Sequence, residues 1–288
     1  MSALTANIAL VSDTSVIDFS QVSIVAAALN KQVARDFGPL WQVDATVSAF
    51  DRLESVPVDY WPVIIRDNIS QPGAAGYHTD NNGQPFSLVQ ADGSWALTAS
   101  HECLEMLADP FGNRTIAGAA PPQASGKAKK LARVLYLVEV CDPCEDDSLT
   151  YQSNGIAVSD FITPHYYEPS AALGMRYSFG GHIKAPHQVL NGGYVSFGDP
   201  TTNQWYQVAV NNRKATTRSL GILNTSGKSL RESIDREVQR LTKGYRTGKV
   251  GTASALATAA GRNSGQHEAR AGRATALRSY IDDLVKVK

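Results

Sequence analysis

The sequence predicts an α+β fold, and three features of its 288 residues indicate it. The first hundred residues alternate short apolar strands with amphipathic helices. Residues 131 to about 210 contain short strand-like stretches separated by turn residues, and the part after Asn212 is mainly helical and basic. We therefore expect a mixed sheet in residues 1–111, a flexible loop at 112–130, a β-rich part at 131–212 and a C-terminal arm at 213–288.

In the first part, apolar runs predict strands at residues 8–12, 44–50 and 60–67. Asp18 begins a helix whose apolar residues recur every three or four positions as far as Phe37, and Gly38-Pro39 should end it. Asn82-Gly83 predicts the turn of a β-hairpin between residues 76–79 and 85–90. We expect His78 to be a hairpin residue, although it could approach the site described next.

A helix after Trp95 carries the most informative motif of the chain, His-Glu-x-x-Glu. His101 and Glu105 are four residues apart and so project from one helix face, with Glu102 about 100° around the axis. Two ligands on one face and a neighbouring carboxylate that can take a proton from water are what a hydrolytic zinc site requires. The apolar residues before His101 indicate a buried helix, and Asp109-Pro110 should end it.

A zinc site with two helical ligands needs a third protein ligand, and an acidic cluster follows about thirty residues later. Glu139, Asp142 and Glu145 are the first candidates, and Asp160 and His165 come next. A solvated loop after a strand would explain the same cluster, so both interpretations stay open here.

These motifs resemble those of a diffuse family of zincin-like metallopeptidases, many of them bacterial or phage proteins, and more distantly those of plant exordium-like proteins. The matching residues are His101, Glu102, Glu105, Asp109 and Pro110, followed by Glu139, Val140 and Asp142. The resemblance covers roughly residues 70–170. It implies a metal ion held by His101 and Glu105, a general base at Glu102 and a nearby carboxylate from Glu139 or Asp142.

The resemblance also implies a zincin-like mixed sheet in which the strand before the active-site helix is an edge strand that binds an extended peptide. Residues 85–90 would be that strand. Glu105 stands where the commoner motif has a second His. Because a carboxylate-rich site lowers the pKa of water less, metal binding is a stronger expectation than proteolysis.

Charge is distributed unevenly along the chain. Residues 213–288 hold 16 of the 27 Lys and Arg but 6 of the 27 Asp and Glu, which gives the arm a net charge of +10 and the preceding part −10. The arm has few bulky apolar residues, so it should pack on the body or on a partner. Its scarcity of aromatic residues argues against nucleic acid and for a protein partner or self-association.

Other function classes are disfavoured by simple features. The sequence has no run of eighteen apolar residues and no basic, apolar leader, so we expect neither a membrane span nor a Sec signal, and a cytoplasmic or virion-associated protein. Three cysteines argue against a disulfide framework, and acidic residues after Cys141-x-x-Cys144 make a redox site a minor alternative.

Two functions from different classes remain. The first is a zinc-dependent hydrolase that cleaves a peptide or amide bond. The second is a non-catalytic structural protein of a phage particle or another large assembly, which uses the basic arm for contacts.

Overall fold

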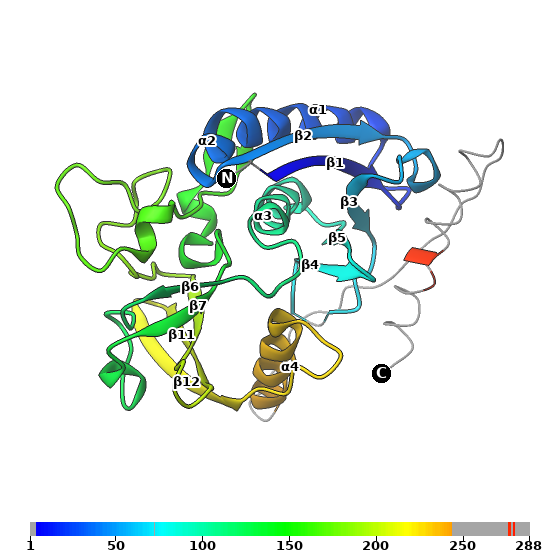
Figure 1. Cartoon of the computed structure of the whole chain (residues 1–288). Helices are drawn as coiled ribbons and strands as arrows, with labels where there is room; N and C mark the ends of the chain where they lie inside the picture. Colours follow the sequence, from blue (N-terminus) through cyan, green and yellow to red (C-terminus); the bar gives the residue numbers. More distant parts are fainter. Residues whose placement is uncertain (1–3, 72, 244–275, 278, 280–288) are drawn as a thin grey trace. The chain divides into compact units, whose positions relative to one another are not determined.

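The computed structural model describes residues 4–71, 73–243, 276–277 and 279 (Figure 1). The chain divides into two compact units. Unit 1 comprises Met1–Pro110, Gln152–Val158 and the described residues of Thr252–Lys288, and unit 2 comprises Phe111–Tyr151 and Ser159–Gly251. Helices and strands are mixed in the chain, which confirms the predicted α+β class.

Unit 1 is built on a five-stranded sheet of order β2-β1-β3-β5-β4. All neighbouring strands are parallel except β4 and β5, which form the predicted hairpin. The interior strand β1 pairs in parallel with β2 and β3, and its residues Ile8–Val11 are all buried, as is typical of parallel strands whose two faces are both covered. The strands are β1 (Leu4–Ser12), β2 (Val43–Phe50), β3 (Tyr60–Arg66), β4 (Gly76–Asn81) and β5 (Gln84–Gln90).

The first helix begins where the sequence predicts but continues further. Asp18 caps α1 (Phe19–Lys31) in a capping box with Gln21. The chain then passes through a π-helical turn (Gln32–Phe37) into α2 (Gly38–Trp41). The prediction that Gly38-Pro39 ends the helix was wrong, because Pro39 occupies the first turn of α2, where its missing N–H is not needed.

The two long helices of unit 1 pack on the same face of the sheet. The Ser100 hydroxyl of α3 (Trp95–Ala108) donates a hydrogen bond to Gln32 Oε1, which follows α1, at 2.8 Å. A separate apolar cluster contains Ala9, Val11, Ile64, Phe86 and Leu88 from the strands, together with Leu277. The alternation of side chains along each strand therefore assigns this cluster to the opposite face.

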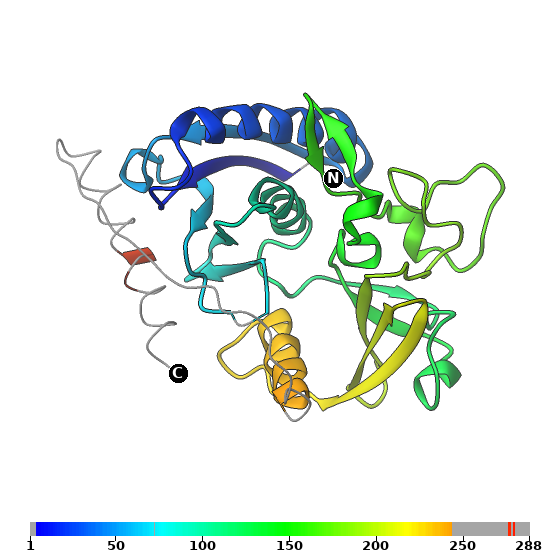
Figure 2. The ribbon, with the colours of Figure 1, turned by 180° about the vertical axis from the view of Figure 1, so that it is seen from behind.

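A short hairpin from later in the chain also belongs to unit 1. It consists of β8 (Tyr151–Ser153) and β9 (Ile156–Val158) and lies beside α1 (Figure 2). Ser153 Oγ donates to the Ala28 carbonyl oxygen at 2.8 Å. The predicted β-rich part, residues 131–212, includes this hairpin, and that boundary was wrong because the contacts with α1 attach the hairpin to unit 1.

The edge strand of the unit 1 sheet differs from the prediction. β5 lies between β3 and β4, so residues 85–90 are not at an edge. The antiparallel strand β4 is the edge strand instead. The second strand of the hairpin, β5, pairs in parallel with β3. The first strand, β4, pairs with the other side of β5 and therefore lies at the edge.

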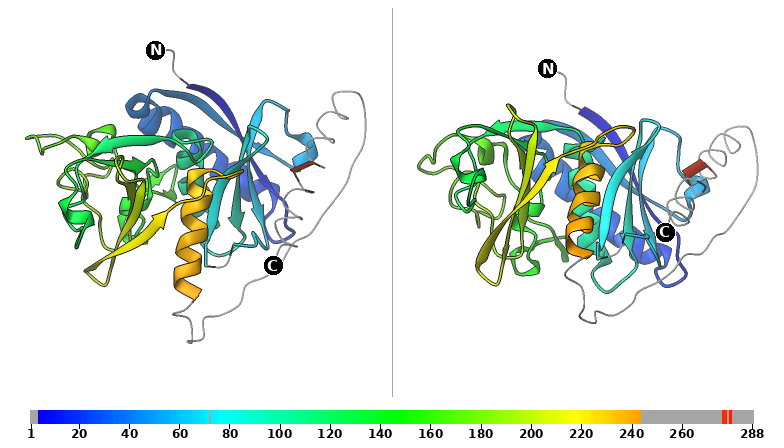
Figure 3. Two further views of the ribbon diagram at one scale, coloured as in Figure 1. Left: turned by 60° about the horizontal axis from the view of Figure 1, so that its bottom comes forward. Right: turned by 90° about the horizontal axis from the view of Figure 1, so that it is seen from below.

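Unit 2 contains an antiparallel five-stranded sheet of order β12-β11-β10-β7-β6. Its strands are β6 (Thr115–Gly118), β7 (Val134–Leu137), β10 (Tyr194–Gly198), β11 (Gln204–Asn211) and β12 (Lys214–Ile222). Helix α4 (Leu230–Lys243) follows β12 (Figure 3) and packs through Ile234 on Leu137, Trp205 and Leu220.

Two expectations for this half of the chain require correction. Residues 112–130 are not only a loop, because they contain β6, which pairs with β7. The C-terminal arm begins as β12, which pairs with β11 along its length. The part of the predicted helical arm after residue 243 lies mostly outside the described residues, although 276 and 277 are helical.

Candidate metal centre

Helix α3 brings the motif residues together as the sequence predicts. The distance between His101 Nε2 and Glu105 Oε1 is 3.3 Å, which confirms that the two side chains share a face. The helix ends at Ala108, and Asp109 has the extended φ of −141° that a residue before proline adopts.

The carboxylates of this helix are deeply buried. The Glu105 side chain is 0% exposed and the Glu102 side chain 4%, whereas the His101 side chain is 15% exposed. A buried carboxylate is strongly destabilising unless a cation or hydrogen-bond donors compensate its charge. The burial predicted for this helix is thus confirmed, and it makes the chemical surroundings of the two glutamates the central question.

His78, on the edge strand β4, faces both glutamates. Its Nδ1 is 3.6 Å from Glu102 Oε2 and 3.9 Å from Glu105 Oε2, and its side chain is fully buried. One ligand atom from each of these three residues lies within 4.8 Å of the others, so the group could hold a metal ion. We expected His78 to be a hairpin residue that could also approach this site, and the structure shows both the hairpin position and the approach.

Strand alternation directs His78 toward α3. His78 pairs with Ser87 of β5, and Ser87 Oγ donates to Met106 Sδ of α3 at 3.4 Å. The neighbouring Tyr77 packs against the apolar cluster on the other face of the sheet. The signal in the sequence was therefore the alternation along β4, which places polar His78 on the inner face of the hairpin.

Gly76 allows β4 to approach α3 closely. A Cβ atom at this position would lie 2.7 Å from Thr98 Cγ2, 2.8 Å from Glu102 Cγ and 2.9 Å from Glu102 Oε1. Since real Cβ contacts are longer than this, only glycine fits here without movement of its neighbours.

The predicted third ligands lie in unit 2. Glu139 follows β7 and forms an ion pair with Arg231 of α4, with Nε 3.4 Å from Oε1. Asp142 is buried at the start of a 3-10 turn (Asp142–Cys144), and Glu145, just after that turn, is exposed. Because a metal site that joins these carboxylates to α3 would span both units, their role as ligands stays a prediction.

The two second-tier candidates have other interactions within unit 2. Asp160 Oδ1 accepts hydrogen bonds from the Phe161 and Gly180 backbone N–H groups at 2.8 and 2.7 Å. Burial raises the pKa of its carboxyl group. His165 Nδ1 lies 2.6 Å from Glu168 Oε1 in a half-exposed pair.

The three cysteines, Cys103, Cys141 and Cys144, are buried and form no disulfide. Burial raises the pKa of the Cys103 thiol to about 12. A thiol with so high a pKa is a poor nucleophile, because the thiolate is the reactive form.

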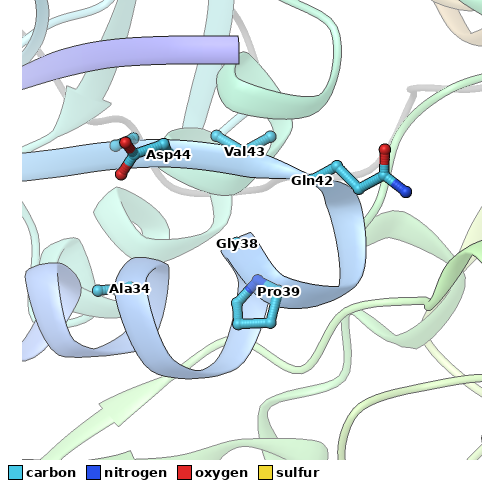
Figure 4. A pocket seen from close by; sticks show the side chains of 7 residues that line it. Ala34, Gly38, Pro39, Gln42, Val43 and Asp44 are labelled. Carbon is cyan, nitrogen blue, oxygen red and sulfur yellow. The ribbon is translucent and has the colours of Figure 1, made fainter. Parts of the chain in front are cut away.

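A shallow pocket on unit 1 lies between the end of the first helical segment and β2 (Figure 4). It is lined by Ala34, Gly38, Pro39, Gln42, Val43, Asp44 and Ala45. Asp44 is the one ionisable residue among these seven, and none of them belongs to the His78–Glu102–Glu105 group. The pocket therefore lacks a group of converging catalytic side chains.

Within the described part of the chain, none of the helices combines the length and the apolar character needed to cross a membrane. Comparisons of the chain with protein-family models, with curated proteins and with solved structures found no match.

Proposed function

We propose that this chain is a zinc-dependent hydrolase that cleaves a peptide or amide bond. His101 and Glu105 hold the metal ion, and Glu102 is the general base. The observation that carries the proposal is the 3.3 Å distance between His101 Nε2 and Glu105 Oε1 on a buried helix. Two ligands of a tetrahedral zinc ion with bonds of about 2.0–2.1 Å stand about 3.3–3.4 Å apart, so the donor pair fits.

The order of elements in unit 1 supports the same proposal. Unit 1 contains, in order, a strand, a helix, two strands, a hairpin and a helix. This is the order of elements in the N-terminal subdomain of a zincin, the family whose motifs this chain resembles. Likeness at the level of fold raises the expectation of this chemistry, whereas the function itself has to be argued from the site.

Each residue has a distinct role in this proposal. A bound zinc ion polarises a substrate carbonyl group and increases the acidity of water. Glu102 is next to His101 in sequence, and its carboxylate accepts the proton of the attacking water and passes it to the leaving amine. The substrate main chain pairs with the edge strand β4, whose outer side has no partner strand among the described residues.

The third ligand comes from Glu139 or Asp142 in this proposal. Glu139 also forms an ion pair with Arg231, with Nε 3.4 Å from Oε1.

The test measures zinc and hydrolysis in the same purified samples. His101→Ala should lose the zinc ion that His101 holds, whereas Glu102→Gln should retain that ion and lower the hydrolysis of a peptide library by about 10²–10⁴-fold. His182→Ala is the matched control, since His182 is an exposed histidine of unit 2 and should change neither quantity. A zinc content that His101→Ala leaves unchanged would contradict the proposal.

The alternative function makes a different prediction for the same samples. A structural protein of a phage particle or another assembly would retain zinc without hydrolysing any peptide. In that case residues 213–288 would provide the contacts, and truncation within them would change the assembly state on a sizing column.

A further inference from the structure

Glu105 presents its two carboxylate oxygens to two different histidines. Oε1 lies 3.3 Å from His101 Nε2, and Oε2 lies 3.9 Å from His78 Nδ1. All three residues belong to unit 1, and Glu105 is fully buried. A carboxylate in this position can bridge two cations, one on each side.

The hydrogen bond of His78 determines which of its nitrogens can be a ligand. Nε2 lies 3.1 Å from the carbonyl oxygen of Asp109, which can only accept a hydrogen bond. Nε2 therefore carries the proton, and in neutral imidazole the lone pair is on Nδ1. That lone pair is directed toward Glu102 Oε2 at 3.6 Å and Glu105 Oε2 at 3.9 Å.

We propose that unit 1 holds a second divalent transition-metal ion, such as Zn²⁺, between His78 Nδ1, Glu102 Oε2 and Glu105 Oε2, with Glu105 bridging it to the ion at His101. An imidazole nitrogen with two carboxylates is a donor set that suits zinc and manganese. A hydrogen bond from the second imidazole nitrogen to a backbone carbonyl is also the usual support of a metal-binding histidine. The separations of 3.6 and 3.9 Å contract only slightly to reach the spacing of about 3.3–3.4 Å around such an ion.

The second ion also compensates the buried charge. Glu102 and Glu105 bring two buried carboxylates close together, and an ion between them would offset their negative charge. In two-metal hydrolases the ions stand about 3.5–4 Å apart and stabilise both the attacking and the leaving groups. Glu102 then has two functions on two oxygens: Oε2 faces His78, whereas Oε1 lies near Gly76 and accepts the proton.

This inference goes beyond the proposed function, because hydrolysis with one ion does not require His78. The informative variant is His78→Gln. The glutamine amide nitrogen can occupy the place of Nε2 and donate to Asp109, whereas nothing replaces Nδ1. A thermal melt close to that of the wild type would show that the variant is folded. His78→Asn is a second variant, in which the amide oxygen can take the place of Nδ1 and retain weaker binding.

Zinc titrated into the chelator-treated full chain, together with elemental analysis, tests the proposal. We expect two zinc ions per chain in the wild type and one in either His78→Gln or His101→Ala. His182→Ala should keep both ions. One zinc ion per chain that His78→Gln does not remove would overturn the inference and leave the proposed function standing. A count that responds to His78→Gln but not to His101→Ala would contradict the proposed function instead.

Discussion

Replacing Gly76 with alanine should push Glu102 away from β4 and destabilise unit 1. The added Cβ would lie 2.7 Å from Thr98 Cγ2 and 2.8 Å from Glu102 Cγ, closer than real Cβ contacts. Thr98 is β-branched and has little rotamer freedom in a helix, so Glu102 or the β4 backbone has to move.

The size of the effect follows from two opposing contributions. Overpacking a buried site costs about 1–3 kcal/mol, whereas Gly→Ala stabilises by about 0.4–1 kcal/mol through the unfolded chain. The free energy of unfolding should therefore fall by about 0.5–2 kcal/mol. Zinc affinity should fall as well, because Glu102 is displaced from His78.

Urea denaturation followed by circular dichroism measures the stability change, with Gly93→Ala as the control. Gly93 is exposed, and a Cβ there meets no atom within 4 Å, so this variant should be as stable as the wild type or slightly more stable. If Gly76→Ala were as stable as Gly93→Ala and bound zinc normally, the close approach of β4 to α3 would be refuted.

Three further predictions concern other parts of the chain. Arg231→Ala should lower the free energy of unfolding by about 1–3 kcal/mol, because it leaves the buried Glu139 carboxylate without the Arg231 guanidinium. Arg240→Ala is the control at an exposed ion pair and should change the free energy of unfolding little. Equal effects of the two variants would contradict this prediction. Leu277→Ala should cost about 2 kcal/mol in the same assay if Leu277 contributes to the core, since it is only 2% exposed there; an unchanged value would refute this. Burial lowers the pKa of His187 from 6.5, so the unfolded chain binds a proton that the folded chain does not. Stability should therefore fall as the pH drops below about 6.5, and His187→Gln should show a smaller loss in urea titrations at pH 7.5 and 5.5.

The elements that the sequence predicts well are those with strong local signals. Asp18 and Gln21 fix the start of α1, and Asp109-Pro110 fixes the end of α3. In the same way, four-residue spacing was sufficient to place His101 beside Glu105. Each of these features depends on residues within one or two turns of one another, which is the range over which local backbone preferences act.

The features that the sequence could not predict depend on pairing between distant segments. The edge position of β4 results from the parallel pairing of β5 with β3, which no local pattern encodes. The return of the β8–β9 hairpin to unit 1 depends on contacts with α1. The ion pair between Glu139 and Arg231 could not be predicted either, because Arg231 is 92 residues further along the chain.

His78 illustrates both what the sequence can predict and what it cannot. Its chemistry was visible in the sequence, but its orientation was not, because a shift of one residue in the β4–β5 register would turn it to the other face. The observed register pairs His78 with Ser87 and so directs it toward the two glutamates of α3.

The most direct test of the central claim is the zinc content of the purified full chain beside that of His101→Ala. Elemental analysis of both proteins at equal concentration, after dialysis without chelator, gives the ratio of zinc to protein. The proposed metal centre predicts stoichiometric zinc in the wild type and the loss of one ion in His101→Ala. A wild type that binds no zinc, or a variant that retains all of it, would contradict the metal centre at His101 and Glu105.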